Sequence, residues 1–428
     1  MSRQAEREAE RGRGRASASL AERLFETRRR SLTIAEPLSP EDMTVQAMED
    51  ASPTKWHLAH VTWFFETFVL TAFLADYEIY DQRFPYCFNS YYESAGPRQP
   101  RPSRGLLTRP SCEEVLGYRR FVDRGLERLL AGSCPAEAER LIELGIQHEQ
   151  QHQELMLTDI LALFGANPLR PAYRAPTAPA PGGSAGTRSI ELPGGICRVG
   201  HRGPGFCWDN ERPDHSALLQ TYSLADGVVT NGEWLEFMRD GGYRKPLLWL
   251  AEGWAAVQRE GWEAPGYWEQ SDGGWRQMTL EGLLAPDPAA PVCHVSYYEA
   301  DAFARWAGKR LPTEHEWEAA VVNAGETDAG DREALRPEPA AHGRGGLRQA
   351  FGAVWQWTAS AYLPYPGYRA PEGAIGEYNG KFMVSQHVLR GSSCLTPSGH
   401  SRPTYRNFFY PHQRWQMTGV RLAAEVES

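Results

Sequence analysis

Apolar positions at helical spacing dominate the first third of the chain and predict four helices. The starts of the last three carry a cap residue, a proline at the first helical position or a Ser-x-x-Glu capping box. A cap accepts one of the N–H groups that a helix start leaves unpaired, and a proline lacks that group. Four helices with long links between them predict a helical bundle. The expected ranges are 18–30, about 53–74, 112 to about 130, and 135 to about 165.

The fourth predicted helix places polar residues on the side that should be buried. Three leucines define that side, and the helical period adds His148, Gln151 and His152 to it. Two histidines one turn apart can reach one metal ion between packed helices. A hydrogen-bonded pair of core histidines is the alternative. Glu154 lies ~200° around the helix axis from His152, so a third ligand is expected elsewhere in the chain.

The composition changes after the predicted bundle. Residues 169–188 are rich in proline and glycine, which is typical of a linker between domains. Short strand-like runs, many glycines and only two convincing helices follow, and they predict an α+β domain. Those helices begin at capping boxes led by Ser296 and Thr313. The expected organisation is a disordered N-terminus at 1–16, a bundle at 17–168, the linker, and a second domain at 189–428.

A long connection links the second and third predicted helices. Connections of this length in a compact bundle are more often functional than idle. This one contains two adjacent tyrosines and three arginines, so it is a candidate functional segment, and a solvated basic loop is the alternative. These residues are Tyr91, Tyr92, Arg98, Arg101 and Arg104.

Charge and cysteine spacing narrow the class of protein. A net charge of −9 argues against a nucleic-acid surface as the main function. No apolar run approaches a membrane span, and the basic N-terminus lacks the apolar core of a secretory signal, so a cytoplasmic location is expected. The seven cysteines are scattered without CxxC spacing, which favours reduced thiols over disulfides or zinc ligands.

Motifs in both halves of the chain carry a family resemblance. Leu58-Ala-His60 followed by His148-Glu-Gln-Gln-His152 resembles the iron-binding DinB-like bundle of the ergothioneine-biosynthesis sulfoxide synthases, the EgtB family. The second half resembles the formylglycine-generating-enzyme fold, a C-type-lectin-like α+β fold. Its matching segments include Val229-Thr-Asn-Gly-Glu-Trp234, Trp306-Ala-Gly-Lys-Arg-Leu-Pro-Thr-Glu-His-Glu-Trp317, Val354-Trp-Gln-Trp357 and Gly419-Val-Arg-Leu422.

The resemblance implies an iron(II) site made of His60, His148 and His152. Three neutral imidazoles suit ferrous iron and leave coordination positions open for oxygen and a thiolate. His57 matches no family ligand, and we interpret it as a packing residue or a partner of a ligand. The implied reaction consumes O2 and joins C2 of N-alpha-trimethylhistidine (hercynine) to a cysteine-type thiol, cysteine or γ-glutamylcysteine, with oxidation of the sulfur to a sulfoxide.

The resemblance also assigns residues to the histidine-derived substrate. Gln151 matches the family glutamine that hydrogen-bonds the imidazole, and the segment around Asn407 matches one that lines the pocket. A trimethylammonium group cannot donate a strong hydrogen bond, so aromatic faces such as those of Phe408 and Phe409 suit it. Core packing is the alternative for either ring.

For the thiol, Arg101 and Arg104 are spaced like the family pair that binds a carboxylate. In the branch that takes γ-glutamylcysteine, an aspartate and a further arginine hold the glutamyl part, whereas this chain has Phe409 and Gln413 at those places. Burying a charged group without its partner is costly. We therefore expect free cysteine to be accepted at least as well as γ-glutamylcysteine.

A tyrosine near the iron favours C–S bond formation over simple thiol oxidation in part of the family. Asn89-Ser-Tyr91-Tyr92-Glu resembles the branch in which that tyrosine lies on the bundle loop. A phenol can supply a proton or a hydrogen bond to an oxygen species. We expect Tyr92 to have this role, with Tyr91 as the second candidate.

Three other functions compete with this interpretation. A formylglycine-generating oxidase depends on a cysteine pair in the C-terminal segment, where this chain has Cys394 alone. An ovothiol-type 5-histidylcysteine sulfoxide synthase uses similar domains, but the chain ends at Ser428 without the methyltransferase domain of those proteins. A non-catalytic binding module would not need the three histidines.

Overall fold

The chain forms two compact units in the computed structural model, which describes residues 18–178, 186–325, 334–340 and 346–426. Unit 1 comprises Met1–Thr44, Ser52–Ser90 and Arg98–Gln153, and unit 2 comprises Val45–Ala51, Tyr91–Pro97 and Glu154–Ser428. The N-terminus expected to be disordered at 1–16 lies outside the described residues, as does part of the expected linker at 169–188. In the described part of the chain, no helix is long and apolar enough to span a membrane.

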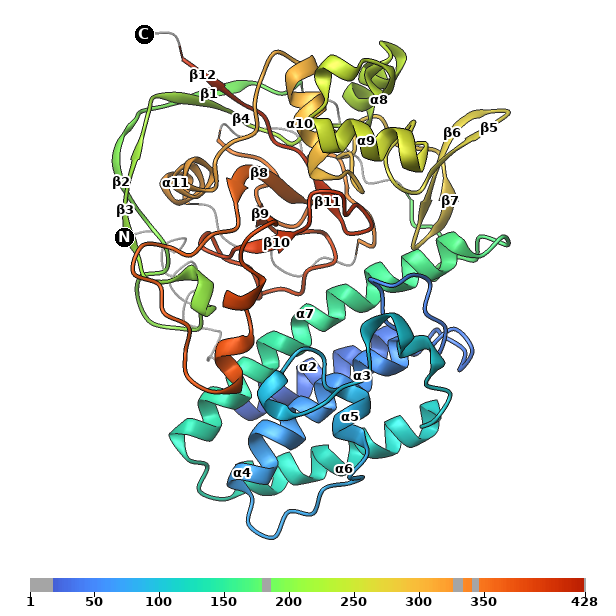
Figure 1. The fold of residues 1–428 in the computed structure, drawn as a ribbon, viewed down its shortest axis with the longest axis vertical. Coiled ribbons are helices and arrows are strands. Elements are labelled where there is room, and N and C mark those ends of the chain that lie inside the picture. The colour runs from blue at the N-terminus through green and yellow to red at the C-terminus, as the bar shows by residue number, and fades with distance from the viewer. Residues whose placement is uncertain (1–17, 179–185, 326–333, 341–345, 427–428) are drawn as a thin grey trace, which may run out of the picture. The chain divides into compact units, whose positions relative to one another are not determined.

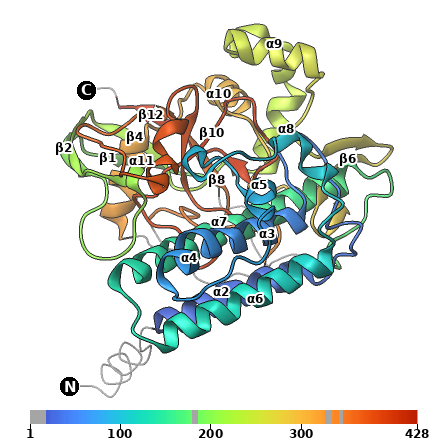
Figure 2. The ribbon, with the colours of Figure 1, turned by 60° about the horizontal axis from the view of Figure 1, so that its bottom comes forward.

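Unit 1 is the predicted helical bundle. Its long helices lie side by side in Figures 1 and 2: α2 (Leu20–Ala35), α3 (Thr54–Phe65), α6 (Cys112–Ala131) and α7 (Ala136–Ala166), whose last residues belong to unit 2. A π-helical turn, η1 (Glu66–Leu70), and α4 (Thr71–Phe73) extend α3. The connection before α6, the candidate functional segment, contains α5 (Phe84–Phe88) and the 3-10 helix η3 (Arg101–Leu106). It also contains the 3-10 helix η2 (Glu93–Ala95), whose residues belong to unit 2. The capping box at Ser111 starts α6 as predicted.

The buried face of α7 is broader than the predicted apolar stripe. Its leucines at 141, 144 and 155 are only partly buried. Side chains of α7 contact three other helices of the bundle, so one stripe does not describe its environment. The fully buried positions include Ile142, Ile146, His148, Glu149, Gln153 and Met156.

Unit 2 has the predicted α+β structure, built from small sheets. The largest has the strand order β10-β9-β8-β11, in which β8 (Trp355–Ala361) pairs antiparallel with β9 (His387–Gly391) and parallel with β11 (Thr418–Gly419). β10 (Asn407–Phe409) forms one edge of it. The smaller sheets are β1 (Ser189–Leu192), β4 (Tyr222–Ala225) and β12 (Ala423–Glu425); β5 (Trp268–Ser271), β6 (Gly274–Thr279) and β7 (Gly282–Leu284); and the pair β2 (Gly195–Val199) and β3 (His215–Leu219).

The described part of unit 2 has more helices than expected. Ser296 and Thr313 cap α10 (Tyr297–Trp306) and α11 (Glu314–Ala324) as predicted. The expectation of only two helices is wrong, because α8 (Asn231–Arg239) and α9 (Ala251–Glu260) are also present. The signal for α8 is its own capping box, led by Thr230, which accepts from the backbone N–H of Glu233.

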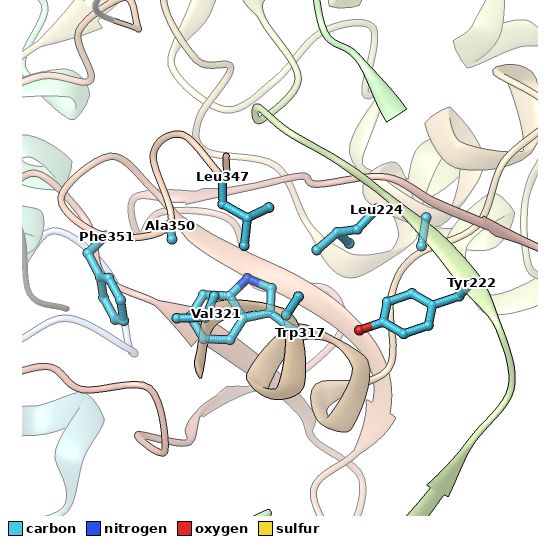
Figure 3. Packing of buried hydrophobic residues seen from close by; sticks show 9 residues of the cluster. Tyr222, Leu224, Trp317, Val321, Leu347, Ala350 and Phe351 are labelled. Carbon is cyan, nitrogen blue, oxygen red and sulfur yellow. The ribbon is translucent and has the colours of Figure 1, made fainter. Parts of the chain in front are cut away.

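Trp317 of α11 lies at the centre of a hydrophobic core in unit 2. Figure 3 shows its indole beside Val321 and Leu347, with Leu224 and Tyr222 farther along the same core. The side chain is fully buried, and its Nε1 donates to Gln356 Oε1 across 2.8 Å. The indole thus buries its apolar area without leaving its polar atom unpaired.

A buried ion cluster joins α11 to the large sheet. Glu314 accepts hydrogen bonds from Arg390 of β9 at 2.8 Å and from Arg406, next to β10, at 2.8 and 2.9 Å. Burial alone would raise the pKa of Glu314, but Arg406 and Arg390 hold it at about 2. The carboxylate is therefore ionised at neutral pH.

All seven cysteines are free, as their scattered spacing predicts. Burial raises the pKa of the Cys293 thiol to about 12. It also raises the pKa of Cys87, Cys197 and Cys207 above the usual value of a thiol.

Candidate functional site

Two helices of unit 1 bring three histidines together. His60 lies on α3, and His148 and His152 lie one turn apart on α7. One ring nitrogen from each lies within 4.8 Å of the others, and Nε2 of His60 is 3.1 Å from Nε2 of His148. The three residues that the sequence nominates as ligands therefore meet at one point.

The ring of His60 is oriented by two neighbours. Its Nδ1 lies 2.6 Å from the carbonyl oxygen of Phe88, so this nitrogen carries the proton and Nε2 keeps a lone pair. Trp56, one turn earlier on α3, stacks on the imidazole with ring centroids 4.7 Å apart and planes 13° apart. A fixed tautomer and a fixed ring plane are what a metal ligand requires.

Burial keeps the three imidazoles neutral. It lowers the pKa of His148 to about 3. It also lowers the pKa of His60 and His152 well below the usual range, and the charge of a protonated His148 would lower both further. Neutral imidazoles have the lone pairs that a metal ion needs, so the donor set fits a divalent transition metal.

A buried ion cluster lies next to the histidines on α7. Glu149 accepts hydrogen bonds from Arg119 of α6, from Arg28 of α2 at 3.1 Å and from Ser31 at 2.6 Å. Although burial opposes its ionisation, Arg119 and Arg28 hold the pKa of Glu149 below its usual range. No pattern in the sequence predicts this cluster. Its only local signal is a charged residue directly after His148, because both arginines are distant in sequence.

The two arginines nominated for the thiol have different surroundings in unit 1. The guanidinium of Arg104 lies 3.4 Å from the centroid of Trp56, the ring that also stacks on His60. It is buried and donates to two serine hydroxyls at 2.9 and 3.2 Å. Arg101 is exposed at the start of η3. Of the two, Arg104 is therefore the one held beside a residue that contacts the histidines.

Two further polar residues of α7, Gln151 and Glu154, have different surroundings. Gln151 is partly buried, one residue before His152. Glu154 does not belong to the histidine cluster, in agreement with its predicted direction on the helix. Its carboxylate accepts hydrogen bonds of 2.5–2.8 Å from three side chains of unit 2: Trp355, Ser393 and Thr396.

The candidate catalytic tyrosines lie together in unit 2. Tyr92 is fully buried and stacks on Tyr91, with ring centroids 4.7 Å apart. Burial raises the pKa of Tyr92 well above its usual range, and Tyr91 adds to the shift. The phenol of Tyr92 is therefore protonated at neutral pH and can act as a donor.

The residues nominated for the acceptor pocket form β10 in unit 2. Phe408 stacks on Tyr362 with centroids 4.0 Å apart, and Phe382 lies 6.1 Å from it. Phe382 also lies edge-on to Tyr91 at 5.1 Å, so it links a candidate catalytic residue to a candidate binding residue. The side chain of Asn407 accepts the backbone N–H of Phe408 at 2.9 Å.

A carboxylate lies close to the nominated thiol-specificity positions. Phe409 is partly buried on β10, and Gln413 is buried just beyond it. The Nε2 of Gln413 lies 3.4 Å from Oδ2 of Asp50, a residue 363 positions earlier in the chain. That separation is why no sequence pattern connects Asp50 with this segment.

Comparison with protein families defines the class of this chain. Residues 23–156 match the DinB superfamily, and residues 176–334 and 338–426 match the Sulfatase-modifying factor enzyme 1-like domain. The chain is thus a DinB-type helical bundle followed by a sulfatase-modifying-factor-like α+β domain, which confirms the predicted fold class.

Comparison with individual proteins is more specific. The hercynine oxygenase of Mycolicibacterium thermoresistibile is 34% identical, over 96% of this chain and 95% of that relative. The hercynine oxygenase of Mycolicibacterium smegmatis is 36% identical, over 66% of this chain and 71% of the relative. This chain belongs to the hercynine oxygenase family, and it is an enzyme of the oxygenase class. The formylglycine-generating enzyme of Streptomyces coelicolor is 29% identical over only 50% of this chain and 82% of that relative.

Proposed function

We propose that this chain is a non-heme iron(II)- and O2-dependent sulfoxide synthase of ergothioneine biosynthesis. It forms a bond between C2 of hercynine and the sulfur of a cysteine-type thiol, and the sulfur is oxidised to the sulfoxide. The observation that carries the proposal is the convergence of three buried, neutral imidazoles within 4.8 Å, in a chain of the hercynine oxygenase family.

In this proposal His60, His148 and His152 hold the iron. Iron(II) with three imidazole ligands supplies open positions for O2 and for the substrate thiol. The three ligands are neutral, so the site keeps the positive charge that favours binding of a thiolate. The hydrogen bond from His60 to Phe88 supports this role, because it orients the ring of one ligand before the metal binds. The ion cluster around Glu149 ties the turn of α7 that carries His148 to α2 and α6.

For hercynine, we assign Gln151 to the imidazole and β10 to the pocket, through Asn407, Phe408 and Phe409. The stack with Tyr362 covers one face of Phe408. A trimethylammonium group would therefore contact the part of the Phe408 ring that neither Tyr362 nor Phe382 covers, or the ring of Phe409, through cation–π attraction.

For the thiol, we assign Arg101 and Arg104 to the substrate carboxylate, which a guanidinium can bind through charge-assisted hydrogen bonds. The contacts of Arg104 with Trp56 and two serine hydroxyls support its part, because they fix the guanidinium before the substrate binds. Both cysteine and γ-glutamylcysteine fit this assignment, and we propose cysteine as a substrate used at least as well.

We assign the control of oxygen chemistry to Tyr92, with Tyr91 as the second candidate. A phenol that stays protonated at neutral pH can donate a hydrogen bond or a proton during the reaction. The burial of Tyr92 and the direction of its pKa shift support this role.

Domain limits and location complete the proposal. We propose a bundle domain at 17–168, a linker at 169–188 and a formylglycine-generating-enzyme-like domain at 189–428. We also propose a cytoplasmic location, which is supported by seven free cysteines, because reducing compartments keep thiols unpaired.

One experiment tests the proposed reaction. Protein loaded with iron(II) without oxygen is mixed with hercynine and either cysteine or γ-glutamylcysteine, and is then exposed to O2. Mass spectrometry should find the sulfoxide conjugate of the two substrates, and none without iron. Preference for histidine over hercynine would indicate a 5-histidylcysteine sulfoxide synthase instead. Folded, iron-loaded protein that forms no conjugate with any of these substrates would contradict the proposal.

A further inference from the structure

His57 lies three residues before His60 on α3, so the two side chains share one side of the helix. Both are buried, with exposed fractions of 2% and 0%. The Nδ1 of His57 lies 2.8 Å from the Nδ1 of His152 on α7. Helix α3 therefore reaches the histidine cluster twice, directly through His60 and indirectly through a hydrogen bond to His152.

The direction of this hydrogen bond follows from the number of protons. A bond between two imidazole nitrogens needs one N–H group and one lone pair. When a metal occupies Nε2 of His152, the neutral ring carries its proton on Nδ1 and has to donate it. His57 then accepts at Nδ1 and keeps its own proton on Nε2. The opposite direction would place a proton on Nε2 of His152 and block the metal.

We propose that His57 is a positioning residue for the metal ligand His152, whose Nδ1–H it accepts, and that it thereby fixes the tautomer and the ring orientation of this ligand. The inference rests on the proposed metal centre. Histidine ligands commonly donate their second N–H group to an acceptor, which raises metal affinity. The carbonyl of Phe88 is in that position for His60, and the imidazole of His57 is in that position for His152.

An imidazole acceptor differs from a carboxylate in one respect. A carboxylate would add a negative charge beside the ligands and make His152 more basic. A neutral imidazole fixes the geometry without adding charge. Another neutral acceptor at the same place should therefore reproduce the role of His57.

Two variants of His57 distinguish its role as a hydrogen-bond acceptor from its role in packing. His57→Phe keeps a ring beside Trp56, which lies edge-on to His57 at 5.8 Å, but it has no acceptor. His57→Asn puts an amide oxygen close to the place of Nδ1. Full-length protein is titrated with iron(II) in the absence of oxygen against a chromogenic chelator. We expect His57→Phe to bind iron about 10–100-fold more weakly, and His57→Asn to recover most of the affinity.

The outcomes distinguish this inference from the proposed function. Equal iron affinity in the wild type and His57→Phe would overturn the role of His57 and leave the metal centre intact. A wild-type protein that binds no iron would overturn both.

The tautomers provide a readout that packing alone would not change. In Zn(II)-loaded protein with 15N-labelled histidine, we expect NMR to show His57 neutral with its proton on Nε2, and His152 with its proton on Nδ1. A proton on Nδ1 of His57 in this form would overturn the inference. If His57→Phe does not fold, as judged by circular dichroism, the tautomers and the affinity of His57→Asn decide the question.

Discussion

Arg28 of α2 and Glu149 of α7 form an ion pair across 3.1 Å inside unit 1, and their side chains are 2% and 0% exposed. Glu149 directly follows the proposed ligand His148 on α7. Arg119 of α6 binds the other oxygen of the same carboxylate. Three helices are thus joined by one buried negative charge at the turn that carries a ligand.

Glu149→Gln should destabilise the bundle by about 3–5 kcal/mol, because it removes the charge shared by two buried guanidinium groups. Glu143→Gln is the matched control on the same helix. The ion pair of Glu143 with Arg23 is partly exposed, with side-chain exposures of 20% and 41%, so its loss should cost about 0–1 kcal/mol. Denaturant unfolding of the metal-free proteins measures both. Similar losses for the two variants would contradict the importance of the buried cluster.

His60→Ala, His148→Ala and His152→Ala should each lower iron occupancy and abolish turnover while the bundle stays folded, because each removes one of three ligands. His57→Ala should be far milder, because it removes the partner of a ligand. Metal analysis after desalting measures occupancy, and circular dichroism checks the fold. An empty site in His57→Ala together with a filled site in His60→Ala would show that the ligand assignment is wrong.

Tyr92→Phe should keep iron and substrate binding but divert product from the C–S conjugate toward the sulfinic acid of the thiol. The reason is loss of the one donor group, since the ring and its stacking on Tyr91 are retained. Product ratios from mass spectrometry measure the effect. Tyr91→Phe and the double variant identify which phenol acts, and unchanged ratios in all three would remove this role from both tyrosines.

Cysteine should support turnover at least as well as γ-glutamylcysteine. Arg104→Leu should raise the Michaelis constant for the thiol about tenfold or more, because a charge-assisted contact with the substrate carboxylate is lost. The Michaelis constant for hercynine should change much less. Arg101→Leu should act in the same direction, and Arg109→Leu, an exposed arginine beyond η3, is the control. Steady-state kinetics with both thiols measure the constants.

A strong preference for γ-glutamylcysteine that survives loss of both arginines would contradict the assignment of the thiol site. Loss of that preference in Asp50→Asn would instead show that Asp50, beside Gln413, binds the glutamyl part of the substrate. Asp50 would then take the role of the aspartate that the γ-glutamylcysteine branch has at the position of Phe409.

Acid should destabilise unit 2 through Glu314. Its pKa is about 2 in the folded protein against 4.5 for an ordinary glutamate, so the unfolded chain binds the proton more readily between these values. The stabilisation, about 3 kcal/mol, is fully present above pH 4.5 and is lost as the pH falls toward 2. Unfolding from pH 7 to pH 3 should show a gap between wild type and Glu314→Gln that narrows with acid. A constant gap would contradict this origin of the stability.

Features of this fold that depend on neighbouring residues can be predicted from the sequence, whereas contacts between distant segments cannot. The capping boxes led by Ser111, Ser296 and Thr313 predict helix starts, because all the residues of such a box lie within four positions of the chain. The i, i+4 spacing of His148 and His152 likewise points to one ion. The same pattern is present at Thr230, where α8 begins. The surrounding glycines and short apolar runs favour irregular structure, which is why this helix was not expected.

The partners of the candidate site depend on how helices pack. His57 and His152 are 95 positions apart, and Arg28 and Glu149 are 121 positions apart, so no periodicity connects them. The apolar-stripe argument also assumes that a helix buries one face. It fails for α7, where Glu149 and Gln153 are buried by neighbours on other sides. Helical periodicity alone indicates His148 and His152 on α7 as candidate metal ligands. The third candidate, His60, comes from the family resemblance.

The raised thiol pKa values of Cys87, Cys197, Cys207 and Cys293 affect the chemoselectivity of an enzyme that oxidises sulfur. A thiol reacts with oxidants and binds metals chiefly as the thiolate, and at neutral pH these four side chains remain almost entirely protonated. The proposed substrate thiol, which a metal ion would help to deprotonate, therefore competes with few sulfur nucleophiles of the protein itself. Burial of these cysteines would in this way protect the enzyme against self-oxidation during its own turnover.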